Sequence, residues 1–233
     1  MKKIAIFFIL LVFAAFAYLG FQAASTLRAN SAVDGMPANS ATALASTQQN
    51  ILLVHVDDLS AAKPKLISVW GAFVYYANNN QIMFIPLLPS YDSAVQNQML
   101  TDFGLDKSRH ITSRFISRLQ QKFNIKVTGV VMVDNAGLSI LNTQLAGQTN
   151  PVVAAVPEGS DQIHLVLMNG QFFFQSICAT VQSKNKDVYN SLDWSQLAPD
   201  HLVTTMPFET IMVDFQKVFT SSSSNQCTVL STE

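Results

Sequence analysis

The feature that most constrains the fold of this chain is the stretch from Asn50 to Asp58, a short, continuous apolar run that ends in two acids. A run of this length without polar alternation is typical of a strand that is buried on both faces of a sheet. Such a strand delivers the carboxylates of Asp57 and Asp58 to the edge of the sheet. The two acids are therefore the first candidates for a functional site, although a solvated pair of acids at a strand end gives the same pattern.

Two further strands are predicted directly downstream, as a β-hairpin. Apolar residues run from Leu66 to Tyr76 and again from Ile82 to Pro86, with three consecutive asparagines between the two runs. Asparagine tolerates the left-handed backbone conformation that a tight connection requires. The rest of the domain is expected to pack around the sheet that these strands begin.

After the hairpin, helical and strand-like patterns alternate. Four apolar residues recur at a spacing of four between Ile111 and Phe123 and predict a helix that ends at Asn124. The β-branched segment Lys126–Asp134 is typical of a strand, and Ala136–Leu145 is typical of a short helix. This alternation predicts an α/β domain.

The second half of the domain has a less regular pattern. Its short apolar runs are interpreted as strands, and its Phe-rich segment and the amphipathic segment after Pro207 as helices. In chain order, the expected elements are a strand at Val152–Val156, a strand at Ile163–Met168, a turn at Asn169–Gly170, a helix at Gln171–Val181, a loop at Lys184–Asp200, a strand at His201–Met206 and a final helix from Pro207.

The N-terminus predicts export. Lys2 and Lys3 precede an uncharged apolar run from Ile4 to Phe21, which is long enough to cross a bilayer once with the lysines on the cytoplasmic side. We interpret residues 1–22 as a retained signal anchor, which predicts a single-pass protein of the cell membrane. A cleaved signal peptide is the alternative, because small residues follow the run. In both cases the domain lies outside the cytoplasm.

The 233 residues suffice for one sizeable domain with flexible ends. Residues 23–49 are rich in small and polar side chains and are predicted to form a flexible tether. The folded domain is assigned to residues 50–220. The serine-rich residues 221–233 are predicted to form a disordered tail.

The charge composition excludes some classes of function. The formal net charge is −1 and only 12% of the residues are charged, so no overall field attracts nucleic acid. The chain has four arginines, the last of them at position 118. Because the guanidinium group is the usual protein ligand of phosphate, this scarcity argues against phosphate chemistry.

The two cysteines, Cys178 and Cys227, leave two alternatives open. In an exported chain they can form one disulfide that ties the tail to the Phe-rich helix. They can equally remain independent thiols, because Cys178 also suits the apolar face of a helix.

The order of these elements resembles the LytR–CpsA–Psr family of bacterial cell-envelope proteins. The likeness extends from the opening strand, which ends in Asp57, through the hairpin with Ile85-Pro86, to the helix–strand–helix segment from Phe123 to Gly147. The membrane anchor and the tether also match. The resemblance implies a single α/β/α sandwich with a mixed central sheet, preceded by a transmembrane helix.

Family members transfer a glycopolymer from a polyprenyl pyrophosphate lipid to peptidoglycan. They use a divalent metal held by aspartates, arginines that bind the pyrophosphate, and an apolar channel beside the sheet for the lipid. In this chain, Val69–Tyr76 and the triplet Phe172-Phe173-Phe174 are candidates for lining such a channel. Ordinary core packing is the alternative explanation for these residues.

The metal and the pyrophosphate contacts carry over only in part. Asp57 matches the first metal-binding aspartate, and together with Asp58 it is the candidate Mg²⁺ site. The family's Arg-x-Asp-Thr motif falls on Lys65–Ser68, so Lys65 replaces the arginine and Ile67 the aspartate. Asp57 and Lys65 are therefore the candidate catalytic residues.

Other charged positions of the family are lost altogether. The Ile-Pro-Arg-Asp motif falls on Ile85–Leu88, where both charged residues are leucines, and no basic residue stands where a later pair of arginines is expected. Lys63 and Lys65 remain as candidate contacts to an anionic head group, but lysine lacks the bidentate geometry of arginine.

The leading hypothesis is therefore a membrane-anchored domain that binds a polyprenyl lipid or an envelope glycopolymer without efficient catalysis. An active glycopolymer phosphotransferase that uses Asp57, Asp58 and Lys65 is the first alternative. The second is an exported interaction or adhesion module. None of the three involves nucleic acid.

Overall fold

The computed structural model describes residues 48–76, 81–146, 157, 159–183, 192–207, 209–211, 213–214 and 226–231. The predicted anchor, nearly all of the tether, the asparagine turn and the strand expected at residues 152–156 lie outside the described residues. Among the helices that are described, none has the length and apolarity needed to span a membrane.

A six-stranded mixed sheet forms the centre of the domain, in the order β5-β4-β1-β2-β3-β6. Strand β1 runs parallel to β4, and β3 runs parallel to β6, whereas the other neighbours are antiparallel. The predicted mixed sheet and α/β class are confirmed. The strands are β1 (Gln48–Val56), β2 (Leu66–Tyr75), β3 (Gln81–Leu88), β4 (Gly129–Asp134), β5 (Leu202–Thr204) and β6 (Gln226–Val229).

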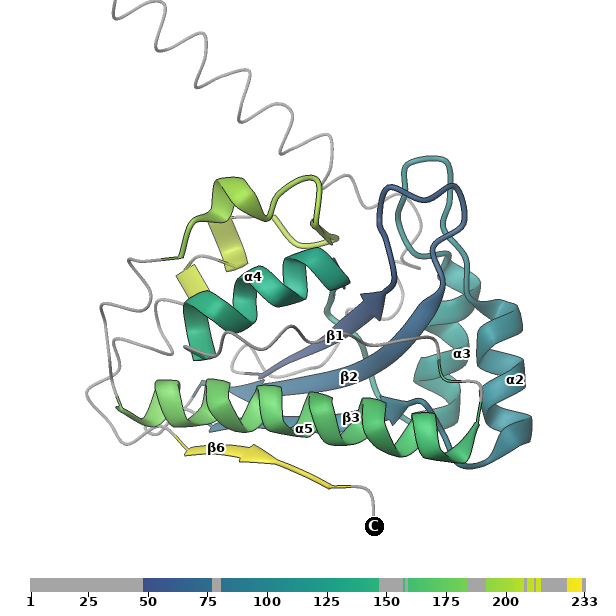
Figure 1. Ribbon diagram of the computed structural model, residues 1–233, viewed down its shortest axis with the longest axis horizontal. Helices are drawn as coiled ribbons and strands as arrows, with labels where there is room; N and C mark the ends of the chain where they lie inside the picture. Colours follow the sequence, from purple (N-terminus) through teal and green to yellow (C-terminus); the bar gives the residue numbers. More distant parts are fainter. Residues whose placement is uncertain are drawn as a thin grey trace, which may run out of the picture.

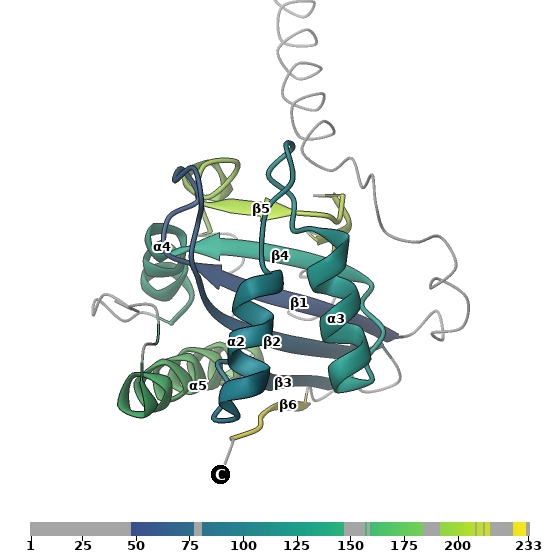
Figure 2. The same ribbon diagram turned by 90° about the vertical axis from the view of Figure 1, so that its right-hand side faces the viewer.

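Helices cover both faces of this sheet (Figures 1 and 2). Helices α2 (Ser93–Asp102) and α3 (Ser113–Phe123) pack on one face, and α4 (Asn135–Ala146) and α5 (Ser160–Ser183) pack on the other. Strand β1 lies inside the sheet between β2 and β4, as its continuous apolar sequence predicts.

The two faces of β1 belong to different parts of the core. Leu52 and Val54 contact the cluster on the α2/α3 side, which also contains Phe115 of α3. Leu53 packs against the cluster on the α4/α5 side. Successive side chains of a strand point to opposite faces, so β1 contributes to both.

Helix α3 ends where the sequence predicts, because Asn124 adopts the left-handed conformation at φ 50°. Helix α2, by contrast, was missed. Its N-cap is Asp92, whose carboxylate accepts hydrogen bonds from the backbone N–H groups of Ala94 and Val95. The segment Asp102–Ser108, whose polar residues are also typical of a helix start, belongs to the end of α2 and the loop after it.

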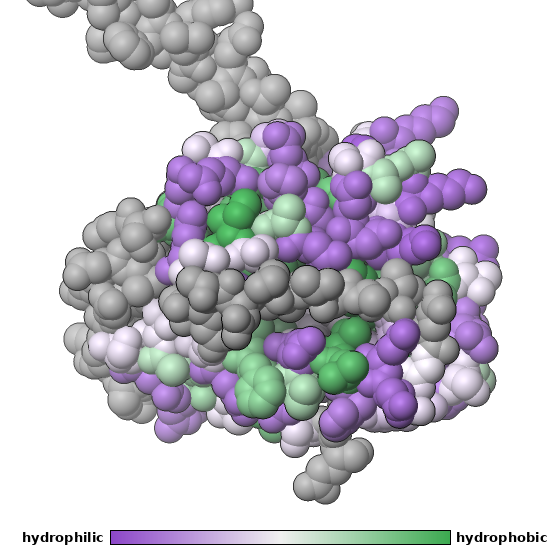
Figure 3. Space-filling model, viewed as in Figure 1, coloured by the Kyte–Doolittle hydropathy of each residue, from purple (hydrophilic) through white to green (hydrophobic). Residues whose placement is uncertain are grey.

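The expected strand at Ile163–Met168 and the turn at Asn169–Gly170 are wrong, because α5 runs unbroken through both. Its buried side chains recur at helical spacing over its whole length: Val166, Leu167, Phe173, Phe174, Cys178 and Val181. Gly170 serves close packing here, since a Cβ at this position would lie 2.7 Å from Cζ2 of Trp70. On its outer side α5 exposes Leu165 and Phe172, and Figure 3 shows apolar surface along this helix.

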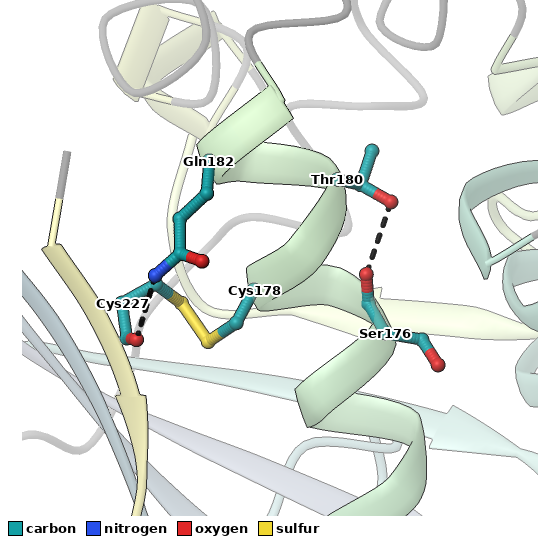
Figure 4. Close-up of a disulfide and its surroundings, with 5 residues drawn as sticks. All are labelled: Ser176, Cys178, Thr180, Gln182 and Cys227. Atoms are coloured by element: carbon teal, nitrogen blue, oxygen red, sulfur yellow. Dashed lines mark hydrogen bonds between the residues drawn. A yellow bond between two sulfur atoms is a disulfide. The ribbon is translucent and has the colours of Figure 1, made fainter. Parts of the chain in front are cut away.

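Strand β6 lies within the segment that was expected to be a disordered tail. Cys227 of β6 forms a disulfide with Cys178 of α5, with 5.1 Å between the two Cα atoms (Figure 4). Gln182 of α5 also donates a hydrogen bond to the Cys227 carbonyl oxygen. The serine-rich sequence does not predict a strand here, because β6 is held by residues distant in the sequence. The alternative of two independent thiols is wrong.

Candidate functional site

Asp57 follows β1 directly and closes the loop between β1 and β2. Its Oδ1 accepts hydrogen bonds from the backbone N–H of Asp58 at 2.8 Å and of Lys65 at 2.7 Å. The Asp57 N–H in turn donates to the Lys65 carbonyl oxygen. One oxygen of this candidate catalytic carboxylate therefore has a structural role.

Asp58, the next residue of the same loop, is exposed. Its Oδ1 accepts hydrogen bonds from both the backbone N–H and the hydroxyl of Ser60, each at 2.7 Å. These bonds to Ser60 lower the pKa of Asp58, and the charge of Arg109 acts in the same direction. Asp58 is therefore an ionised surface carboxylate at neutral pH.

The structure places all four predicted site residues in this one loop. Lys63 and Lys65 are exposed there, beside Asp57 and Asp58. In the part of the chain that is described, no group of three or more His, Cys, Asp or Glu side chains is placed to hold a metal ion. The loop thus offers Mg²⁺ at most two carboxylates, a number with which Mg²⁺ binds when waters complete its shell. The Mg²⁺ site stays a prediction.

A third carboxylate, that of Asp134 at the end of β4, lies next to this loop. Its side chain is only 3% exposed. Oδ1 accepts a hydrogen bond from the Gly137 N–H in the first turn of α4. Oδ2 accepts one from the Leu59 N–H at 3.3 Å and one from Nδ1 of His201 at 2.9 Å. Asp134 therefore connects the β1–β2 loop, α4 and the residue before β5.

His201 is held against β4 and α4 by more than this bond. Its carbonyl oxygen accepts a hydrogen bond from the Asp134 N–H. A Cβ at Gly137 would lie 2.6 Å from that same oxygen, so only glycine permits this approach of α4. The imidazole remains 36% exposed.

A second histidine, His55, lies close by on β1 and is buried. Its Nε2 hydrogen-bonds to Oδ1 of Asn135 at 2.9 Å. Burial lowers the pKa of His55 to about 4, against the opposing effects of Asn135 and of the Asp134 and Asp57 charges. His55 is therefore neutral at physiological pH, as expected of a core histidine.

These groups share one place in the fold. Strands β1 and β4 are parallel, with Val56 opposite Asp134, so both chains leave the sheet at the same edge. We call this place the carboxyl edge and define it by residues 57–59, 134–135 and 201. The chain goes from here toward β2 on one side and into α4 on the other. Such points of divergence are where α/β sheets usually bind ligands.

An apolar cavity of about 100 Å³ lies between the sheet and helices α4 and α5. The strands contribute Leu53, Trp70 and Val133 to its wall, and the helices contribute Leu138 and Phe173. Leu53 is partly exposed although its strand lies inside the sheet. Its side chain packs against the α4/α5 cluster and also borders this cavity.

The cavity is polar only in a few places. His55 and Ser68 line it, and these two residues are partners across β1 and β2 near the carboxyl edge. Asn169 of α5 also lines it. Of the three phenylalanines considered for an apolar channel, Phe173 and Phe174 line this cavity and are also part of the packed core, whereas Phe172 is exposed. The lipid channel stays a prediction.

The positions at which the family resemblance expects charge are apolar core positions here. Ile67 is 1% exposed, Leu87 7% and Leu88 1%. Two of the four arginines, Arg114 and Arg118, form ion pairs with the buried Asp102. They are thus engaged at the α2/α3 side of the domain.

Sequence reasoning missed Asp134 and His201, which are 67 residues apart. One signal was available for Asp134. Like Asp57, it is an acid directly after an apolar strand, and parallel strands bring such residues to one edge. Nothing local marks His201, because its position depends on how β5 joins the sheet.

Known proteins resemble this chain in structure but not in sequence. No family model matches the sequence, and neither does any curated protein. The structure of TagV from B. subtilis matches with a TM-score of 0.50 and 9% identity, over 82% of this chain and 86% of TagV.

Two further matches have lower TM-scores. TagT bound to LI-WTA matches at a TM-score of 0.45 with 10% identity, over 86% of this chain and 85% of that one. The LytR-Csp2A-Psr enzyme from Actinomyces oris also matches at 0.45, with 9% identity, over 78% and 80%. The likeness to TagV confirms the predicted LytR–CpsA–Psr-like fold. At such low identity it shows the fold alone.

Proposed function

We propose that this protein is a membrane-anchored, extracytoplasmic protein of the cell envelope that binds an isoprenoid lipid, free or linked to a glycopolymer, without transferring it. The observation that carries the proposal is the apolar cavity beside the sheet, with its polar residues His55 and Ser68 near the carboxyl edge. An amphiphilic ligand matches this distribution, with its chain among apolar residues and its polar end at the carboxyl edge.

The size of the cavity limits what it holds without rearrangement. An engineered apolar cavity of about 150 Å³ binds benzene. A cavity of about 100 Å³ therefore takes only a short section of a chain built from isoprene units. Longer chains require α5 to move away from the sheet.

Lack of transfer follows from the missing charges. Each charge-assisted hydrogen bond to a phosphate contributes about 1.5–3 kcal/mol. Ile67, Leu87 and Leu88 are buried and apolar, so none of them contributes such a bond. Lys63 and Lys65 offer point charges in an exposed loop, which are weak substitutes for arginine.

Export is supported by the disulfide between Cys178 and Cys227, because such bonds persist in oxidising compartments. The apolar run at residues 4–21 supports a membrane anchor on sequence grounds.

Titration with geraniol and geranyl phosphate tests the proposal. In a Trp194→Phe background, the fluorescence of Trp70 in the cavity wall reports binding. Leu53→Phe fills the cavity and should lower the affinity for both ligands at least tenfold. Leu165→Phe, the same change on the outer side of α5, should leave it unchanged. If the unsubstituted protein binds neither ligand, the proposal is wrong.

A second assay tests the absence of transfer. With a polyprenyl-pyrophosphate-linked glycan and peptidoglycan as acceptor, we expect no detectable release of polyprenyl phosphate. Release that is abolished by Asp57→Ala would instead favour the active transferase.

A further inference from the structure

We propose that His201 is a ligand-binding residue whose Nε2 accepts a hydrogen bond from a hydroxyl group at the polar end of the ligand. The inference rests on the proposed function, because it concerns the same ligand and identifies its polar group. It assigns a role to a residue for which neither the sequence nor the fold comparison suggests one.

The geometry of His201 determines which ring nitrogen is available. A carboxylate only accepts hydrogen bonds, so the bond of 2.9 Å to Asp134 requires the proton on Nδ1. In the neutral ring, Nε2 then carries a lone pair and is an acceptor. Within the described part of the chain, Nε2 has no hydrogen-bond partner, and the side chain is 36% exposed.

His201 is also held in place more firmly than a surface histidine needs to be. Asp134 is buried and its other oxygen is bonded to the Gly137 N–H, so the carboxylate cannot rotate freely. The backbone of His201 is bonded to Asp134 and packs closely on Gly137. A side chain oriented by buried partners is suited to specific recognition.

Its position connects His201 to the cavity. The next residue, Leu202, lines the cavity wall, and Leu202 is paired with Val133, which also lines it. Asp134 bonds to His201, and its charge also acts on His55, which lines the cavity. A ligand whose chain lies in the cavity is therefore expected to bring its polar end to the carboxyl edge, where the His201 side chain is 36% exposed.

The groups around His201 favour a hydroxyl over a phosphate at this point. Asp57, Asp58 and Asp134 place three carboxylates along the carboxyl edge, and these repel an anion. The exposed Asp58 can also accept a hydrogen bond from a hydroxyl group. The ligand class is therefore an isoprenoid alcohol or an isoprenoid lipid whose head group presents sugar hydroxyls. A phosphate in such a lipid would face Lys63 and Lys65 instead.

The test compares geraniol with geranyl methyl ether, which has the same chain and oxygen but no hydroxyl hydrogen. We expect the protein to bind geraniol about two- to tenfold more tightly, the value of one neutral hydrogen bond. His201→Asn keeps an N–H donor near Asp134 and removes Nε2, so it should abolish this preference while leaving the affinity for the ether unchanged. His164→Asn, the same change at an exposed position of α5, should retain the preference.

The outcomes separate the inference from the proposed function. Equal binding of alcohol and ether by the unsubstituted protein, or a preference that survives His201→Asn, would overturn the role of His201 and leave the lipid-binding proposal intact. Failure to bind either compound would remove the proposed function and this inference with it. Preservation of affinity for the ether in His201→Asn shows that the variant is folded.

Discussion

Oδ2 of Asp134 accepts a hydrogen bond from Nδ1 of His201 at 2.9 Å, and the same oxygen accepts one from the Leu59 N–H. This carboxylate thereby joins the end of β4 to the β1–β2 loop and to the start of β5. It is almost fully buried, so its charge depends on these partners for stabilisation.

Asp134→Asn should destabilise the domain by about 2–4 kcal/mol. Asparagine carries no negative charge. Its NH₂ group would also face at least one of the three N–H groups from which Asp134 accepts hydrogen bonds, those of Leu59, Gly137 and His201. Denaturant unfolding measures the change. Asp161→Asn, an exposed acid in the first turn of α5, is the control and should shift stability by no more than about 0.5 kcal/mol. If Asp134→Asn and Asp161→Asn change the free energy of unfolding equally, the hydrogen bonds of Asp134 do not stabilise the domain.

His55 should make stability depend on pH. Burial lowers its pKa from 6.5 to about 4, so folding favours the neutral ring. This contribution is fully present above pH 6.5 and is lost as the pH falls from 6.5 toward 4, by roughly 3 kcal/mol in total.

His55→Gln retains an amide donor for Asn135 and removes the titration. Unfolding free energies measured between pH 7 and pH 4 should therefore fall less steeply in this variant than in the unsubstituted protein. His164→Gln, at an exposed site, should preserve the original slope. Parallel curves for all three proteins would contradict the burial of a neutral His55.

Gly170→Ala should destabilise the domain although alanine favours helices. The new Cβ would lie 2.7 Å from Cζ2 and 2.9 Å from Cε2 of Trp70, so α5 or the indole must move. We expect a loss of about 1–3 kcal/mol from overpacking, set against a helix-propensity gain of about 1 kcal/mol. Gly159→Ala just before α5 meets no atom within 4 Å and is the control. A stabilised Gly170→Ala protein would refute this packing.

Removal of the disulfide should weaken the attachment of β6. The bond closes a loop between residues 49 positions apart, for which loop entropy predicts about 4 kcal/mol of stabilisation. Cys178→Ala combined with Cys227→Ala should lower the melting temperature, and added reductant should affect only the unsubstituted protein. If alkylation without reductant labels both cysteines, the bond is absent from the protein in solution.

Mg²⁺ binding should depend on Asp58 more directly than on Asp57. Asp58 is exposed and its pKa is lowered, whereas Asp57 also closes the loop. NMR titration with Mg²⁺ should show weak shifts at residues 57–65 that disappear in Asp58→Asn, while Asp92→Asn retains them. Shifts that persist in Asp58→Asn would place the ion elsewhere.

The sequence predicted the parts of the fold that depend on local pattern. Strand β1, the hairpin partners β2 and β3, the helix ending at Asn124 and strand β4 all follow from apolar spacing and a suitable end residue. The pattern failed in α5, where Asn169 and Gly170 resemble a turn but Gly170 is needed beneath Trp70. It failed again at β6, which depends on β3 and on a disulfide.

The same limit applies to the candidate site. The sequence identifies four candidate residues because they directly follow a recognisable strand: Asp57, Asp58, Lys63 and Lys65. Asp134 and His201 meet only after β4 and β5 have joined the sheet, so no spacing in the sequence reveals their contact. Leu87 and Leu88, at the end of β3, are buried, as their apolar side chains indicate.

The most direct test of the account is a crystal structure of the protein with geraniol at saturating concentration. We expect density for the isoprenoid chain between α5 and the sheet, in contact with Leu53 and Trp70, and density for its polar end at the carboxyl edge near His201. A cavity that remains empty at saturation, or a ligand bound on another face of the domain, would contradict the account.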